Sequence, residues 1–144
     1  MRIVIITQND PFFLAENVNY LVKILPKHSE IVACFVGSAS PFGKKDDFLK
    51  KVIKTYNVFG LKFFIYYSTK FILSRFQNSK KIENVLKEKK IDRILLDKHI
   101  NHRESVEIIK NYNPDLLISI LGNQIFKESI INLAPKGCLN LHTA

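Results

Sequence analysis

The sequence predicts a doubly wound α/β fold, in which helices cover both faces of a mostly parallel sheet. Short runs rich in β-branched residues alternate along the chain with segments whose apolar residues recur at helical spacing. The runs are apolar at successive positions, as strands buried on both faces are. Strands that alternate with helices form βαβ units, whose parallel strands join one sheet through right-handed crossovers.

Length and composition fit a single folded domain. The chain has 144 residues, of which 47% are hydrophobic, so it can bury a core and is not intrinsically disordered. The two cysteines, Cys34 and Cys138, exclude a disulfide framework and a cysteine-based metal cluster. They indicate buried small side chains in a reducing compartment, so we expect a cytoplasmic protein without a metal.

The charge is strongly basic and unevenly distributed. There are 22 Lys and Arg residues against 13 Asp and Glu, a net charge of +9. The segment from Lys44 to Arg103 holds 16 of the basic and 6 of the acidic residues, a local balance of +10. Such a balance favours an anionic partner, although AT-rich codons also produce a Lys-rich composition. The longest apolar region, 60–76, is interrupted by basic residues, so we expect no membrane span and no membrane partner.

The first third of the chain reads as a βαβ unit. Residues 2–7 form a β-branched run that predicts a central strand. Asp10 is a candidate N-cap and Pro11 a suitable first helical residue, and Pro26 ends the apolar helical pattern that follows. Residues 30–36 predict the second buried strand.

A helical excursion rich in aromatic residues follows the second strand. Gly60 separates two segments with helical spacing, around 48–56 and 63–76. An aromatic stripe buried in the core, with the lysines in water, is the favoured interpretation. A contact with a partner or a second copy, and a surface for nucleic acid or membrane, are the alternatives.

Alternating helices and strands resume after this excursion. Asn101 is a candidate N-cap for the second helix of this part, and a Pro135–Gly137 turn leads into the last strand. The predicted elements are a helix over 79–90, a strand over 91–96, a helix to Lys110, a strand over 116–122, a short helix over 127–132 and a final strand from Cys138.

The final strand carries two polar residues with chemical potential. Asn140 and His142 are two positions apart, so a strand would project both side chains from the same face. An amide donor beside an imidazole can bind an oxyanion and move a proton. Taken alone, the pair is better explained by an asparagine that caps a strand end and by a satisfied surface or core histidine.

Three segments together resemble a known family. Residues 2–7, 113–120 (N-P-D-L-L-I-S-I) and 137–142 (G-C-L-N-L-H) are similar to the N-terminal catalytic domain of the formyltetrahydrofolate-dependent formyltransferases. Members of that family formylate methionyl-tRNA, glycinamide ribonucleotide or amino sugars. The resemblance runs in order along the chain. It is strong after Asn101 and weak in the basic aromatic middle, and it implies a Rossmann-like sheet.

The resemblance implies roles for particular residues. Asn140 would donate a hydrogen bond to the oxyanion, and His142 would stabilise that oxyanion and assist proton transfer. Sites in open α/β sheets lie beyond the carboxyl ends of the strands, so Gly122 and His142 should be neighbours. The loop after the 116–122 strand matches the family's pterin-binding loop: Leu121, Gly122, Asn123, Gln124 and Ile125.

The implied reaction is formyl transfer from 10-formyltetrahydrofolate to a primary amine. A nucleotide-linked amino sugar is the first expected acceptor and initiator methionyl-tRNA the second, with a homodimer left open. The family's catalytic Asp follows the His, and residues 1–144 end before it. We therefore expect an N-terminal formyltransferase domain that is incomplete at its C-terminus and inactive alone. A non-catalytic α/β binding or interaction module is the competing class.

Overall fold

The computed structural model describes residues 1–8, 10, 13–37, 47–76, 82–122 and 124–141, without the side chains of residues 48, 51 and 74–76. Its strands are β1 (Arg2–Gln8), β2 (Glu30–Gly37), β3 (Asp92–Leu96), β4 (Leu116–Ile120) and β5 (Cys138–Leu141). Its helices are α1 (Leu14–Ile24), α2 (Phe48–Phe76), α3 (Ile82–Glu88), α4 (Arg103–Lys110) and α5 (Glu128–Ile131).

The strands form one parallel sheet in the order β3-β2-β1-β4-β5. The order reverses between β1 and β4, where the chain crosses from one half of the sheet to the other. The predicted doubly wound parallel fold is therefore confirmed. In such a sheet the crevice beyond the carboxyl ends of the strands, near this reversal, is the usual place for a ligand.

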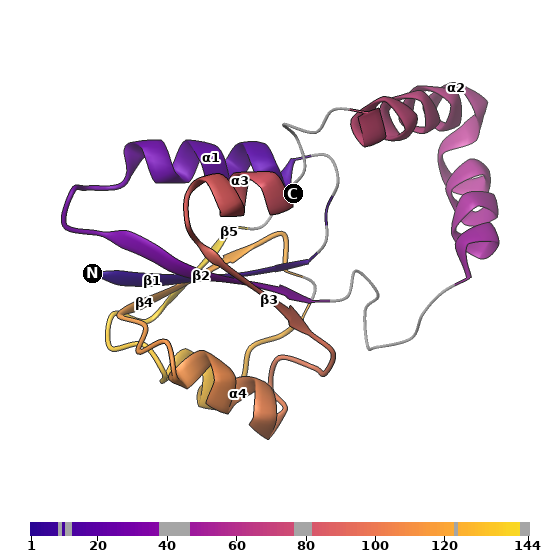
Figure 1. Ribbon diagram of the computed structural model, residues 1–144. Coiled ribbons are helices and arrows are strands. Elements are labelled where there is room, and N and C mark those ends of the chain that lie inside the picture. Colours follow the sequence, from indigo (N-terminus) through magenta and orange to yellow (C-terminus); the bar gives the residue numbers. More distant parts are fainter. Residues whose placement is uncertain (9, 11–12, 38–46, 77–81, 123, 142–144) are drawn as a thin grey trace.

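Helices cover both faces of the sheet (Figure 1). Successive residues of β1 point to opposite faces, so Ile3 and Ile5 join one core cluster while Val4 and Ile6 join the other. The first cluster packs under α1 and α3, and the second under α4 and α5. The central strand is buried on both sides, which explains its uninterrupted apolar run.

Two helix starts differ from the predictions. Helix α1 begins at Leu14, although Asp10 Oδ1 does accept hydrogen bonds from the backbone N–H groups of Phe13 (2.6 Å) and Leu14 (3.2 Å). The predicted first helical residue, Pro11, lies outside the described residues. The N-cap of α4 is His102, whose Nδ1 accepts from the backbone N–H of Glu104, so the prediction that Asn101 caps this helix is wrong. Asn101 is used in a loop contact instead.

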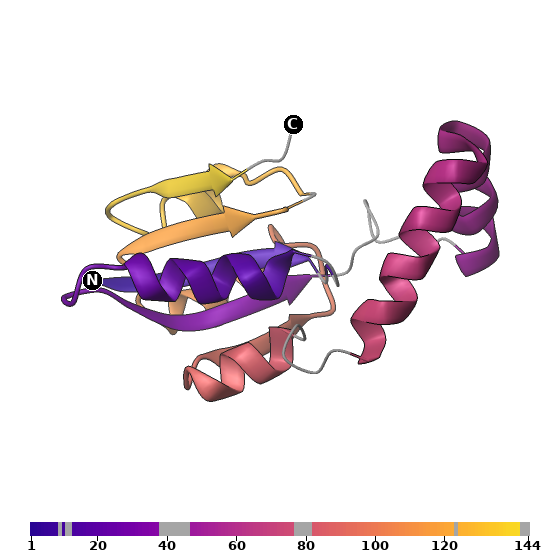
Figure 2. The same cartoon turned by 90° about the horizontal axis from the view of Figure 1, so that it is seen from above.

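Helix α2 stands away from the sheet and from the helices that cover it (Figures 1 and 2). Gly60, with φ 76° and ψ 174°, breaks it into two helices, as the sequence predicted. That backbone conformation is open essentially to glycine alone. The favoured interpretation of its aromatic stripe as core is wrong, because much of the apolar surface of α2 is exposed. The spacing of apolar residues predicts that a segment is helical. It does not predict whether other parts of the protein pack against the apolar face.

Candidate functional site

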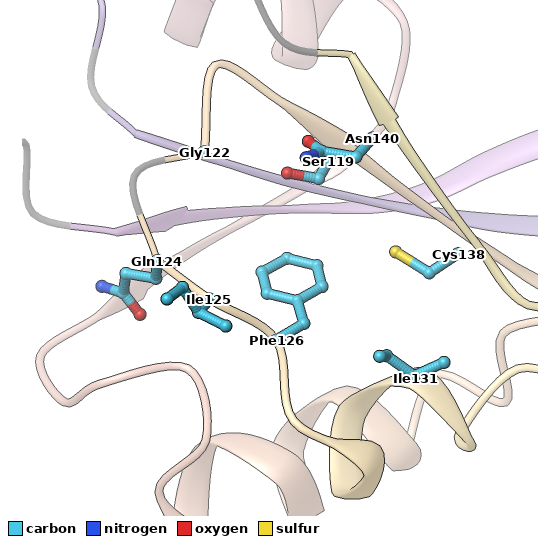
Figure 3. A pocket seen from close by; sticks show the side chains of 8 residues that line it. All are labelled: Ser119, Gly122, Gln124, Ile125, Phe126, Ile131, Cys138 and Asn140. Atoms are coloured by element: carbon cyan, nitrogen blue, oxygen red, sulfur yellow. The ribbon is translucent and has the colours of Figure 1, made fainter.

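A cavity of about 470 Å³ opens at the carboxyl edge of β4 and beside β5 (Figure 3). It lies on the half of the sheet formed by β4 and β5. Strand β4 adjoins β1, and the strand order reverses between these two strands. Its walls are mostly apolar with a few polar groups, and its lining residues are Ser119, Gly122, Gln124, Ile125, Phe126, Ile131, Cys138 and Asn140. Volume and lining are those of a small-molecule site.

One polar pair forms an edge of this cavity. Ser119 of β4 and Asn140 of β5 are register partners on adjacent parallel strands, and their side chains lie together in Figure 3. Ser119 is buried, whereas Asn140 is exposed on the edge strand. An amide that faces a solvent-accessible cavity from a fixed strand position is suited to donate a hydrogen bond to a bound ligand.

Gly122 follows β4 at a point where the chain passes close to its own strand. A Cβ added to Gly122 would lie 2.5 Å from the Oγ of Ser119, so a side chain here would have to displace that hydroxyl. The preceding Leu121 has φ 55°, a left-handed conformation that turns the chain out of the sheet. The absence of a side chain at Gly122 thus lets this turn pack against the cavity wall.

The loop after this turn is held by two side-chain amides. Gln124 Oε1 accepts a hydrogen bond from the backbone N–H of Ile100 (2.7 Å). In the opposite direction, Asn101 Nδ2 donates to the carbonyl of Ile125 (2.8 Å), and Asn101 Oδ1 accepts from the backbone N–H of Lys127 (2.9 Å). These bonds tie the β4–α5 loop to the β3–α4 loop and so hold the cavity wall that Gln124, Ile125 and Phe126 form.

The predicted site residues fall into three groups. Those that line the cavity are Gly122, Gln124, Ile125 and Asn140. Leu121 packs against the core under α1 and α3, and its side chain is not part of the cavity wall. Asn123 and His142 lie outside the described residues, so the expected proximity of Gly122 and His142 stays a prediction.

Four further residues line the cavity without having been predicted as site residues. Phe126 and Ile131 supply apolar walls from the loop and from α5 (Figure 3). Cys138 shares the face of Asn140, as the period of a strand requires. Ser119 could have been found as the one polar residue inside the apolar run of β4, but its position opposite Asn140 depends on the strand register.

The cysteines are poor nucleophiles in this setting. Burial raises the pKa of the Cys138 thiol, so the thiolate is scarce near neutral pH. Burial also raises the pKa of Cys34 to about 12, against a smaller opposite effect from Arg93. Within the described ranges, no group of three or more His, Cys, Asp or Glu side chains could hold a metal ion.

Fold and cavity together define an α/β protein with a candidate small-molecule site at the carboxyl edge of its sheet. Comparison with curated proteins narrows this class. The chain is 36% identical over 67 residues to the methionyl-tRNA formyltransferase of Borreliella afzelii, covering 46% of this chain and 20% of that protein. It is 30% identical over 95 residues to the enzyme of the same name from Borreliella burgdorferi, covering 65% of this chain and 28% of the relative. It is 32% identical over 47 residues to the methionyl-tRNA formyltransferase of Kosmotoga olearia, covering 33% of this chain and 15% of that protein.

These comparisons confirm the resemblance to the formyltransferases that the motifs predicted. The chain spans less than a third of the length of the curated relatives that it matches. No protein-family model matches the chain.

Proposed function

We propose that this chain provides the cofactor-side part of a formyltransferase site. The observation that carries the proposal is the cavity at the ends of β4 and β5, which is lined by Asn140, Gly122 and residues 124–126. The same residues carry the family resemblance, and the relatives with significant similarity are named methionyl-tRNA formyltransferases.

The cavity suits the flat ring of a folate. Its volume of about 470 Å³ lies in the usual range for small-molecule sites, and Ile125, Phe126 and Ile131 offer apolar walls. Polar atoms at its edges, on Ser119 and Asn140, could orient the ring. When bound, 10-formyltetrahydrofolate supplies the formyl carbon that an amine attacks.

The chain's own residues would do three things. The Asn140 amide would donate a hydrogen bond to the oxygen on which negative charge develops, an effect that is usually the largest in such reactions. His142 would take part in proton transfer, a role that rests on the family resemblance. The apolar walls would exclude water and strengthen both interactions.

Initiator methionyl-tRNA is the better supported acceptor. The names of the relatives favour it over the nucleotide-linked amino sugar, which was the first expected acceptor. The basic charge of the chain suits either acceptor, since both are anionic.

Folate binding tests the proposal on this chain directly. We expect 5-formyltetrahydrofolate, a stable relative of the cosubstrate, to bind in a calorimetric titration. Ile125→Asp should weaken binding at least about tenfold, because it places a charge in the apolar wall. Ile125 is 84% exposed, so the fold should survive. Ile24→Asp, at a 57% exposed position on α1, is the matched control and should bind normally.

Activity separates the proposed role of Asn140 from simple binding. In a longer chain that includes the family's catalytic Asp, Asn140→Ala should lower the rate of formyl transfer to methionyl-tRNA about a hundredfold or more, with folate affinity changed less than about twofold. Absence of folate binding by the unmodified chain would favour the non-catalytic module. Transfer to an amino sugar and not to methionyl-tRNA would restore the first expected acceptor.

A further inference from the structure

We propose that α2 is an attachment surface for an anionic lipid bilayer, on which its two helical halves lie in the plane of the interface. The inference is independent of formyl transfer, because it rests on the exposure and the charge of α2.

Exposed apolar surface is concentrated in this one element. More than half of the exposed large hydrophobic side chains of the described residues belong to α2, each between 47% and 65% exposed. They are Leu49, Ile53, Tyr56, Val58, Phe59, Leu61, Ile65, Tyr66, Ile72 and Leu73. Exposed apolar side chains gathered on one element mark an interaction surface.

Half of these ten exposed residues fall into two stripes. In the first half, Leu49, Ile53 and Tyr56 recur at i, i+4 and i+7 and so share one helix face. In the second half, Leu61 and Ile65 are also i, i+4 neighbours on one face. Aromatic side chains join the halves beside Gly60, where Phe59 stacks on Phe63 with ring centroids 4.5 Å apart. The stripes therefore belong to a small structured unit.

The charge of α2 has a single sign. No Asp or Glu occurs between Phe48 and Phe76, whereas the basic residues there are Lys50, Lys51, Lys54, Lys62, Lys70 and Arg75. Lys50 and Lys54 are exposed and, by helical periodicity, lie beside the first stripe and not on it. In this first half, an apolar stripe flanked by lysines is the pattern of helices that lie on anionic membranes.

Other occupants fit less well. A symmetric contact between two copies would bring two basic surfaces together, which costs free energy. Nucleic acid matches the charge but stacks on aromatic rings, whereas most of the exposed apolar residues of α2 are aliphatic. Among the described residues no helix is long and apolar enough to cross a membrane, so α2 would lie on the bilayer.

This inference reverses the expectation of no membrane partner. That expectation rested on the basic residues that interrupt the apolar region 60–76, which argue against a helix that crosses a membrane and not against one that lies on its surface. In the structure, the contact of α2 with the body includes Lys70, whose Nζ lies 4.5 Å from the ring centroid of Phe13 on the chain preceding α1. The stripes themselves face solvent.

Vesicle co-sedimentation of the whole chain tests the proposal. We expect binding to phosphatidylcholine vesicles that contain about one quarter phosphatidylglycerol, little binding to pure phosphatidylcholine, and weaker binding as salt rises. Replacing Lys50, Lys54 and Lys62 together with Gln should lower partitioning about a hundredfold, roughly fivefold for each lysine. Replacing Ile53 and Ile65 together with Ser should lower it at least about tenfold.

Matched controls lie on the body of the protein. Lys87→Gln with Lys110→Gln, on α3 and α4, and Ile24→Ser, on α1, alter exposed residues and should leave partitioning within about twofold. Circular dichroism should show unchanged helix content for every variant. The proposal is overturned if anionic vesicles do not pellet the chain, or if Ile53→Ser with Ile65→Ser has no effect. It is also overturned if light scattering shows a dimer that these variants dissociate, or if tRNA binds and displaces the vesicles.

Discussion

At the scale of single residues, close contacts decide which side chains the site tolerates. At Gly122, in the turn after β4, a Cβ would fit only if the Ser119 hydroxyl moved. No positive φ is involved at Gly122, in contrast to Gly60 and Gly137. The constraint at Gly122 is therefore steric and depends on one neighbouring atom.

Gly122→Ala should lower the free energy of unfolding by about 1–3 kcal/mol, because the added methyl group would lie 2.5 Å from the Ser119 Oγ. Ser119→Ala in the same chain should restore most of that loss, since the nearest remaining side-chain atom, the Cβ, would be 3.9 Å away. Urea denaturation of both single variants and the double variant measures the coupling. Equal destabilisation in the single and the double variant would show that the clash is elsewhere.

At the scale of elements, two loops act as one unit at the carboxyl edge of the sheet. The β3–α4 loop contributes Asn101, and the β4–α5 loop contributes Gln124, and each side-chain amide bonds the other loop's backbone. Buried or half-buried backbone groups need such partners where regular structure ends. The cavity wall thus depends on residues far apart in the sequence.

Asn101→Ala should free the loop that carries Ile125 and Lys127, because it removes two hydrogen bonds at 2.8 and 2.9 Å. We expect a loss of about 1–2 kcal/mol in local stability and faster amide hydrogen exchange at Lys127. Asn111→Ala, at the exposed C-cap of α4, is the matched control and should leave this exchange rate unchanged. Unchanged protection in Asn101→Ala would mean that packing alone holds the loop.

At the scale of the whole molecule, a compact three-layer body carries a projecting basic helical element. The body buries β1 and β2 almost completely, and with them Cys34 in the core under α1 and α3. Burial holds this thiol in its neutral form. The free energy of unfolding should therefore fall at alkaline pH because of Cys34, a residue that has no proposed catalytic role.

The sign of this response follows from the raised pKa of Cys34. Above the ordinary value of 9.0 the unfolded chain loses the thiol proton, whereas the folded chain keeps it until about pH 12. The contribution of this buried thiol to the free energy of unfolding is complete below pH 9.0. Between pH 9.0 and about pH 12 it falls by up to about 1.4 kcal/mol per pH unit. Cys34→Ala should remove that part of the slope in urea denaturation measured from pH 8 to pH 11. An identical slope in the variant would show that Cys34 does not contribute.

Much of the fold could be predicted because its signals are local. The β-branched run of β1 and the apolar residues of α3 each report their own secondary structure and burial. The cap of α4 was misassigned between Asn101 and His102 because adjacent polar residues offer the same chemistry. Which of them caps the helix depended on where Asn101 found partners in another loop.

The candidate site was predictable only in part. Asn140, Gly122, Gln124 and Ile125 carry motif-like patterns, and the structure brings them to one cavity. Ser119 and Ile131 carry no such pattern, because their place in the wall depends on strand register and on how α5 packs.

The sequence by itself determined the order of strands and helices along the chain, the break in the helix at Gly60, and the position of the polar residue Asn140 on the final strand. Each of these follows from period, backbone freedom or alternation within a few residues. Only the tertiary structure decided that Ser119 faces Asn140 and that the stripes of α2 face solvent. Both are properties of contacts between distant segments, which no local pattern contains.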